Sequence, residues 1–198
     1  MRLIIATKNN HKLREIRKIL KGISLPTVSL AALDKKFRIV ENGKTFLENS
    51  LKKSIPVSRA YPQDYVLGED SGLEVDFLRG APGIYSKRYS GRNSTTEKNN
   101  TKLLRALKDV GVKKRGAHFI CCLSLARNGK LIEVFQGKLR GRISTKAIGA
   151  NGFGYDPVLY LPRYKKTVAQ LPLSLKNRIS HRAKAFKKLK THLKNCRL

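Results

Sequence analysis

Two alternating segments joined by Asn128-Gly129 constrain the fold of this chain more than any other feature. Residues 117–126 and 131–135 read as strands. Asn-Gly is the pair that favours a two-residue type I′ turn, because both central positions of that turn need positive φ. We therefore predict a β-hairpin. Cys121 and Cys122 would point to opposite faces of its first strand, an arrangement that disfavours a disulfide between them.

The start of the chain has the pattern of a strand followed by a helix. Residues 3–6 are apolar and predict a short buried strand. Residues 7–10 have turn and N-cap character, and an amphipathic helix should follow them. The residues expected on its buried face are Leu13, Ile16, Ile19 and Leu20.

Further helices and strands follow in alternation. Thr45 and Glu48 form a capping box that predicts a second helix, with a kink or an early end at Pro56. Residues 65–68 read as a strand that runs into an acidic turn at 69–72. Ser94 is expected to cap a third helix, whose apolar residues are Leu103, Leu104 and Leu107. A last helix should begin near Ser180 and turn Ala185, Phe186, Leu189 and Leu193 inward.

Because helices and strands are intermixed and at least one hairpin is present, the predicted class is α/β with a mixed sheet. The 198 residues suit a single domain over 1–198, or one core divided into two lobes. No apolar run reaches the roughly 20 residues of a membrane span. The apolar start is too short for a secretory signal, so the expected location is cytoplasmic and no membrane partner is expected.

The balance of charge is unusual: 43 Lys and Arg residues against 13 Asp and Glu give a formal charge of +30. Such a charge predicts anionic partners, which leaves nucleic acid, acidic lipid head groups and small phosphorylated ligands open. The basic residues are spread along the whole chain and do not form a separate tail. This spread argues against a dedicated nucleic-acid module, and specific nucleic-acid binding is not expected.

The first segment that could take part in binding or catalysis comprises residues 7–12, between the predicted strand and helix. A helix N-terminus presents backbone N–H groups and the positive end of a dipole, so it suits an anion. Thr7, Asn9 and Asn10 add polar side chains, and Lys12 lies one turn into the helix. The alternative is an ordinary capped helix with solvated lysines.

A second segment holds the adjacent acids Glu69 and Asp70. A divalent cation that binds a triphosphate needs one or two carboxylates, and a hydrolase needs a carboxylate to orient or deprotonate water. Glu41, just before the second predicted helix, is a further candidate ligand. The alternative is that these acids pair with surface lysines.

Three further segments lie later in the chain. Residues 80–89 form a Gly/Pro turn followed by aromatic and basic residues. Residues 151–157 place glycines on both sides of Phe153, which would let a flat ligand stack on its ring. The alternative, favoured by this segment alone, is a glycine-rich turn with Phe153 in the core. Residues 176–182 place His181 and Arg182 in the first turn of the last helix, where both could donate to a carbonyl oxygen or to phosphate.

Taken in order, these segments resemble the inosine-triphosphate pyrophosphatase family, which removes non-standard purine nucleoside triphosphates. The resemblance covers nearly the whole chain, through IIATKNNHKLREI, TFLENSLKKS, LGEDSGLEVDFLRGAPGIYSKRYSG, GFGYDPVLYLP and KNRISHRAKAF. It implies an elongated α/β fold with a long mixed β-sheet, flanking helices, and two lobes with a nucleotide cleft between them. It also implies a homodimer, Mg²⁺, and cleavage of ITP, dITP and XTP to the monophosphate and pyrophosphate.

The resemblance implies roles for individual residues as well. Asp70 would be the general base and a metal ligand, Glu41 the second metal ligand, and Ser71 a substrate contact. The triphosphate would be held by Thr7, Lys8, Asn9, Asn10, His11, Lys12 and Lys53. The base and the purine end would be bound by Phe153, Gly154, Tyr155, Asp156, Lys176, His181 and Arg182.

Two other functions stay open at this point. One is a nucleic-acid-binding protein built on an enzyme scaffold, suggested by the basic residues of the last predicted helix. The other is a hydrolase of related fold that acts on modified pyrimidine or 7-methylated nucleotides, against which the GFGYDP and SHR segments argue.

Overall fold

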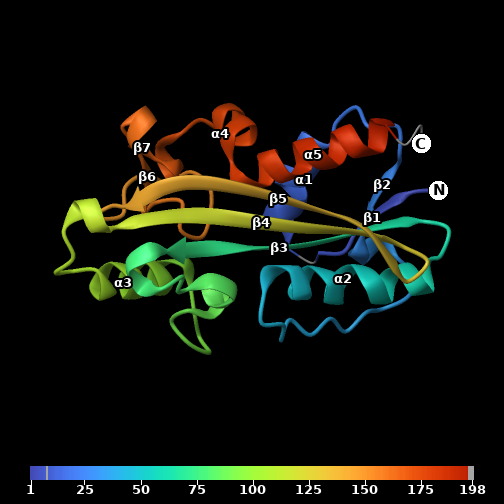
Figure 1. Ribbon diagram of the computed structural model, residues 1–198, viewed down its shortest axis with the longest axis horizontal. Helices are drawn as coiled ribbons and strands as arrows, with labels where there is room; N and C mark the ends of the chain where they lie inside the picture. Colours follow the sequence, from blue (N-terminus) through green and yellow to red (C-terminus); the bar gives the residue numbers. More distant parts are fainter. Residues whose placement is uncertain (8, 196–198) are drawn as a thin grey trace. The chain divides into compact units, whose positions relative to one another are not determined.

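The computed structural model describes residues 1–7 and 9–195 (Figure 1). Its strands are β1 (Leu3–Ile5), β2 (Thr27–Ser29), β3 (Tyr65–Val75), β4 (Gly116–Arg127), β5 (Lys130–Ile143), β6 (Leu159–Leu161) and β7 (Lys166–Thr167). Its α-helices are α1 (Asn10–Ile19), α2 (Phe46–Ala60), α3 (Thr96–Ala106), α4 (Leu173–Ile179) and α5 (His181–Asn195). The strands of the described chain form one seven-stranded sheet in the order β2-β1-β3-β4-β5-β6-β7.

The sheet is mixed, as the intermixed elements predict. Strand β1 pairs in parallel with both β2 and β3, whereas β6 is antiparallel to both β5 and β7. The hairpin β4–β5 turns at Asn128 (φ 49°) and Gly129 (φ 73°), the two positive φ values that a type I′ turn requires. The predicted α/β class is confirmed.

The contacts divide the chain into two compact units. The first unit comprises residues Met1–Ser71, Cys121–Gly137 and the segment from His181 onward. The second comprises residues Gly72–Ile120 and Lys138–Ser180. The expectation of a single domain over 1–198 stays a prediction.

In the first unit, the period-two alternation of strands distributes apolar side chains to both faces of the sheet. Leu3 and Ile5 of β1 pack in one cluster with Ile16 of α1 and Phe186 of α5. Ile4 of β1 packs in another cluster with Val57 of α2 and Val66 of β3. Helices α1 and α5 therefore cover one face of this unit's sheet, and α2 covers the other (Figure 1).

At Gly68, β3 passes close to the backbone of α2. A Cβ atom at residue 68 would lie 2.0 Å from the carbonyl oxygen of Ser50 and 2.8 Å from the hydroxyl of Ser124. We expect Gly68→Ala to lower the free energy of unfolding by about 1–3 kcal/mol, because backbone must move to admit the methyl group.

Gly111 is the matched control for that change. A Cβ there meets nothing within 4 Å and its φ of −58° suits any residue. Gly111→Ala should raise the free energy of unfolding by roughly 0.4–1 kcal/mol, because alanine reduces the conformational entropy of the unfolded chain. Urea unfolding of both variants checks the pair, and equal stabilities would contradict the close approach at Gly68.

The second unit has a separate core. Leu73 and Val75 of β3 pack with Leu103 and Leu107 of α3 and with Tyr155. The buried Arg115 lies beside this core, and its guanidinium donates to the carbonyl oxygens of Leu107, Val110 and Ser144.

Several local predictions are confirmed. Asn9 caps α1 by accepting from the backbone N–H of Lys12, and Thr45 caps α2 by accepting from that of Glu48. Helix α5 begins directly after Ser180, and the four side chains predicted to turn inward are buried. Cys121 and Cys122 are buried free thiols.

Of the two outcomes predicted for Pro56, an early end of α2 is wrong, because the helix continues to Ala60, and a kink stays a prediction. Proline removes one backbone hydrogen bond, but Val57 and Ser58 beyond it are fully buried, and this packing holds the last turn.

The predicted acidic turn at 69–72 is also wrong, since β3 runs through it to Val75. The acids there are satisfied by partners on both faces of the strand. The cap of α3 is Thr95 and not Ser94, whose hydroxyl donates to the carbonyl oxygen of Lys87.

Candidate active site

The two adjacent acids of β3 point to opposite faces of the first unit's sheet. Glu69 meets side chains from α1 and α5, and Asp70 meets side chains from α2. Residues next to each other in a strand necessarily diverge in this way. The two acids that the sequence analysis places in one turn therefore belong to two separate polar clusters.

Asp70 lies in the cluster on the α2 side and is 6% exposed. Its Oδ1 accepts from Lys53 Nζ (3.2 Å) and its Oδ2 accepts from Asn49 Nδ2 (3.1 Å). The same Lys53 ammonium reaches Glu41 Oε2 (2.7 Å) and the carbonyl oxygen of Glu69 (2.9 Å). Helix α2 places Asn49 and Lys53 one turn apart, so both face β3.

Burial raises the pKa of the Asp70 carboxyl, and the nearby Lys53 and Lys12 charges partly oppose that shift. For Lys53, burial would lower the pKa of the ammonium, but Asp70 and Glu41 raise it above its usual value. The cluster thus joins a carboxylate of raised basicity to a charged lysine.

Glu69 lies in the cluster on the α1 and α5 side and is fully buried. Its Oε2 pairs with Lys12 Nζ (2.6 Å), and its Oε1 accepts from Arg182 Nη2 (3.2 Å). The other end of the Arg182 guanidinium donates to Glu15, a buried acid of α1. Burial alone would raise the pKa of Glu69, but the charges of Lys12 and Arg182 hold it well below its usual range.

Ser71 adjoins this cluster, because its hydroxyl accepts from Arg182 Nη2 (3.2 Å). His181, the residue before Arg182, is buried, and its carbonyl oxygen would lie 2.1 Å from a Cβ at Gly137. The start of α5 is thereby fixed against β5.

The predicted anion-binding loop leads into α1. Thr7 Oγ1 accepts from the backbone N–H of Asn9 (3.2 Å), and Asn9 Oδ1 accepts from that of Lys12 (3.2 Å). Lys8 lies outside the described residues, and for Asn10 and His11 only the backbone is described. A role of this loop in holding a triphosphate stays a prediction.

A third group belongs to the second unit. Asp156 Oδ2 accepts from Lys176 Nζ (2.7 Å) and from the backbone N–H of Phe153 (2.9 Å). Lys176 Nζ also lies 4.8 Å from the centre of the Phe153 ring, a cation–π contact. A Cβ at Gly152 would lie 2.1 Å from Asp156 Oδ2, which explains the glycine at this φ of 87°.

The structure therefore brings some predicted residues together within each unit. In the first unit it joins Glu41, Lys53 and Asp70, and separately Lys12, Ser71 and Arg182. In the second unit it joins Phe153, Asp156 and Lys176, while Tyr155 is buried and donates from its hydroxyl to the carbonyl oxygen of Ser86 (2.8 Å).

Sequence reasoning missed Glu15 and Asn49. Both were detectable: Glu15 is one of only 13 acids and lies three residues from Lys12, and Asn49 lies four residues before Lys53. These spacings put each on the same helix face as its neighbour.

The amino-acid sequence matches a known family model, that of the Ham1 family, over residues 3–192. The chain belongs to the Ham1 family. This confirms the resemblance to pyrophosphatases of non-standard purine nucleotides.

Individual Ham1-related proteins align with almost the entire chain. A dITP/XTP pyrophosphatase of Clostridium perfringens is 45% identical, with 98% of this chain and 97% of that protein covered. A dITP/XTP pyrophosphatase of Geobacter sulfurreducens is 44% identical, with coverage of 97% and 96%. The solved structure of the Staphylococcus aureus Ham1 protein is 37% identical, with a TM-score of 0.88 over 98% of this chain and 99% of that one.

Proposed function

We propose that this protein hydrolyses dITP, ITP and XTP to the nucleoside monophosphate and pyrophosphate, and so removes them from the nucleotide pool. The observation that carries the proposal is the buried Asp70 carboxylate, held by Asn49 and Lys53 beside Glu41 in a Ham1-family chain. The relatives named dITP/XTP pyrophosphatase support this choice of substrates.

Asp70 and Glu41 are the residues that would hold Mg²⁺. Both carboxylates contact the same ammonium, that of Lys53, so this place already suits a cation. Among the side chains that the structure describes, no three Asp, Glu, His or Cys residues group to hold a metal ion. Two carboxylates fit Mg²⁺ nonetheless, because Mg²⁺ takes its other ligands from water and substrate phosphates. When bound, Mg²⁺ would neutralise phosphate charge and polarise the reacting phosphoryl group.

Asp70 is the proposed general base. It removes a proton from a water molecule that attacks the α-phosphorus, and the bond from that phosphorus to the bridging oxygen breaks with release of pyrophosphate. Asn49 and Lys53 each bind one carboxylate oxygen and so fix the direction of the remaining lone pairs. Lys12 and the Thr7–Asn10 segment are the proposed contacts of the triphosphate.

Phe153 is the proposed stacking platform for the purine. Lys176 Nζ covers one face of its ring, so a base would stack on the other face. Lys176 is also a donor beside that platform. A donor favours the 6-oxo group of hypoxanthine and xanthine and disfavours the 6-amino group of adenine. Guanine shares the 6-oxo group, so its rejection must depend on its 2-amino group.

Arg182 has a different environment from the one a base-reading donor needs, since both its Nη atoms bind carboxylates. Its proposed contribution is therefore to hold Ser71 and Glu69 in place near Asp70. His181 stays a proposed purine contact.

The first experiment identifies products and substrate class. Purified protein with Mg²⁺ is incubated with dITP, XTP, dATP, dGTP, a modified pyrimidine triphosphate and a 7-methylated purine triphosphate. We expect monophosphate and pyrophosphate from dITP and XTP. Release of orthophosphate and a nucleoside diphosphate would refute the proposal. Turnover of only the modified pyrimidine and 7-methylated purine triphosphates would refute it as well. The nucleic-acid alternative is favoured by an absence of hydrolysis together with tight nucleic-acid binding at physiological salt.

We further propose that the enzyme is a homodimer that acts in the cytoplasm. No described helix is long and apolar enough to cross a bilayer. Light scattering on the eluate of a gel-filtration column tests the dimer directly, and a monomeric mass at micromolar concentration would contradict it.

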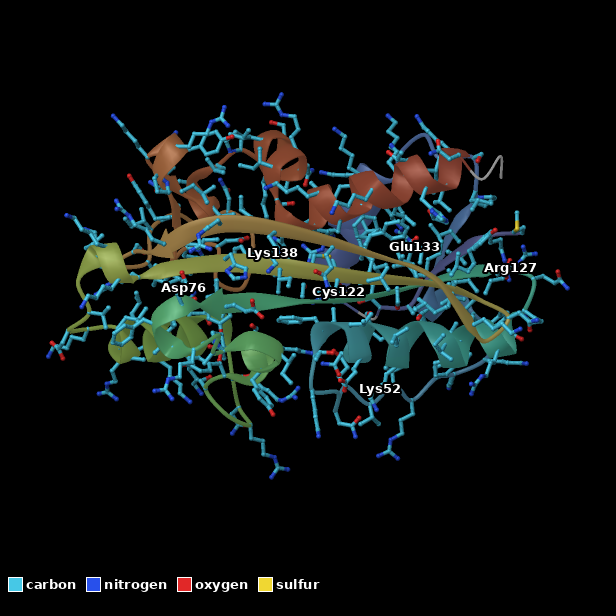
Figure 2. The ribbon with its side chains drawn as sticks, viewed as in Figure 1. Lys52, Asp76, Cys122, Arg127, Glu133 and Lys138 are labelled. Atoms are coloured by element: carbon cyan, nitrogen blue, oxygen red, sulfur yellow. The ribbon has the colours of Figure 1, made fainter. Side chains whose placement is uncertain are left out.

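Lys53 gives a prediction about pH. Its charge opposes the burial that raises the pKa of Asp70. A base is lost as the pH falls through its pKa, so Lys53→Met should move the acidic limb of the kcat/KM profile to higher pH. Lys52→Met is the matched control, since the Lys52 side chain projects from α2 into solvent (Figure 2). Superimposable acidic limbs for wild type and Lys53→Met would contradict the coupling.

A further inference from the structure

Helix α3 reaches the loop that carries the proposed stacking platform. Asn100, 5% exposed, donates from Nδ2 to the carbonyl oxygen of Gly154 (3.1 Å). Gly154 is the residue directly after Phe153. Asn100 belongs to none of the sequence motifs that carry the family resemblance.

The loop needs such a contact because of its own composition. Gly152 (φ 87°) and Gly154 (φ 64°) both adopt the left-handed conformation on either side of Phe153. Glycine gives the backbone this freedom, but it also loses the most conformational entropy when it becomes fixed. The ring direction of Phe153 therefore depends on hydrogen bonds that hold the two flanking peptides.

The two sides of Phe153 are held by different elements. On the side towards α4, Asp156 accepts from Lys176 Nζ and from the N–H of Phe153. On the side towards α3, Asn100 holds the Gly154 carbonyl group. Asn100 and Asp156 thus hold the loop on either side of Phe153.

Helix α3 is itself fixed at the same place. The preceding residue, Asn99, accepts from the backbone N–H of Ser90 (2.7 Å) and donates to the carbonyl oxygen of Lys87 (3.2 Å). The Tyr155 hydroxyl donates to the nearby carbonyl oxygen of Ser86. Asn100 thus extends from a helix whose start is anchored to the segment that also binds Tyr155, which makes it a rigid support for the loop.

We propose that Asn100 is a positioning residue that sets the place of the Phe153 ring and thereby the affinity for the purine and the choice among purines. It acts through the Gly154 carbonyl group and touches no reacting atom. The inference rests on the proposed function, because that function makes Phe153 the base platform.

The test uses Asn100→Asp, which keeps the shape of the side chain and replaces the donor with an acceptor that repels the Gly154 carbonyl oxygen. Asn93→Asp is the control with the same change in charge, since Asn93 is exposed. For Asn100→Asp we expect the KM for dITP to rise about tenfold, the change a lost buried hydrogen bond produces, with kcat altered less than about threefold. The ratio of kcat/KM for dITP over dGTP should fall, and the amides of residues 152–155 should exchange hydrogen faster.

If Asn100→Asp does not fold, Asn100→Ala carries the same expectations without a new charge. An unchanged KM and an unchanged dITP to dGTP ratio in a folded variant would overturn the inference. A fall in activity that only matches the fraction of unfolded protein would also overturn the inference, because it would show that Asn100 has a purely structural role.

Titration with the product IMP separates this inference from the proposed function. Weaker IMP binding by Asn100→Asp than by wild type and Asn93→Asp supports the positioning role even if wild type releases no pyrophosphate from dITP, a result that would refute only the proposed function. Equal IMP affinities in the three proteins would overturn the inference and leave the proposed function intact.

Discussion

Asp70→Asn is expected to lower kcat for pyrophosphate release from dITP by about 100-fold to 10,000-fold, the range that general-base catalysis contributes. The asparagine retains the size of the side chain but cannot take a proton from water. The substitution removes the charged carboxylate that accepts from Asn49 and Lys53, while the backbone of β3 is unchanged. Initial rates of pyrophosphate release with Mg²⁺ measure the effect.

Asp109→Asn is the control for this substitution, because Asp109 is exposed and belongs to neither unit's polar cluster. It should retain wild-type kcat. Folding of Asp70→Asn is checked by circular dichroism and by urea unfolding. A folded Asp70→Asn protein that keeps more than a third of wild-type kcat would show that Asp70 is not the base.

Arg182→Met is expected to lower the free energy of unfolding by about 3–5 kcal/mol, the second large effect. Arg182 is 1% exposed, and its removal leaves Glu15 and Glu69 buried with fewer positive charges beside them. Breaking a buried ion pair by deleting one partner costs more than the pair contributes, because the remaining charge stays out of water.

Arg140→Met provides the comparison, since the Arg140–Asp76 pair is exposed to solvent. Its free energy of unfolding should stay close to that of wild type. Urea unfolding of the two variants and of Glu15→Gln/Arg182→Met measures the coupling. The double variant should recover part of the lost stability, and a loss under about 1 kcal/mol for Arg182→Met alone would contradict the buried network.

The sequence predicts the regular parts of this fold well, because they depend on local patterns. The Asn128-Gly129 hairpin, the caps at Asn9 and Thr45, and the inward face of α5 follow from turn chemistry, capping and helical periodicity. Each of these signals lies within a few residues of the structure it produces.

The errors arise where distant residues override the local pattern. Glu69–Gly72 reads as a turn, yet Lys12 and Arg182 neutralise Glu69 from helices far away in the chain, and the strand continues. Pro56 predicts a kink or an early helix end, yet the helix continues because burial of Val57 holds the turn beyond it. Local sequence propensity carries no information about such distant partners.

The candidate site shows the same division. Asp70 and Glu41 follow from their residue types and Lys53 follows from the family resemblance, and the structure joins all three. The environment of Arg182 does not follow, because a basic residue at a helix start reads as a free donor until Glu15 and Glu69 are seen beside it. Asn100 carries no sequence signal at all, since its partner is a backbone carbonyl group 54 residues later.

Above all, we propose that this protein selects dITP, ITP and XTP over adenine nucleotides and cleaves them with release of pyrophosphate. The most direct test is a competition in which equal concentrations of dITP and dATP are offered to the enzyme with Mg²⁺ and both monophosphates are quantified. We expect dIMP to form at least about 100-fold faster than dAMP, since a donor beside the base leaves the adenine amino group without a partner. Equal rates of dIMP and dAMP formation, or formation of neither, would contradict this selectivity and activity.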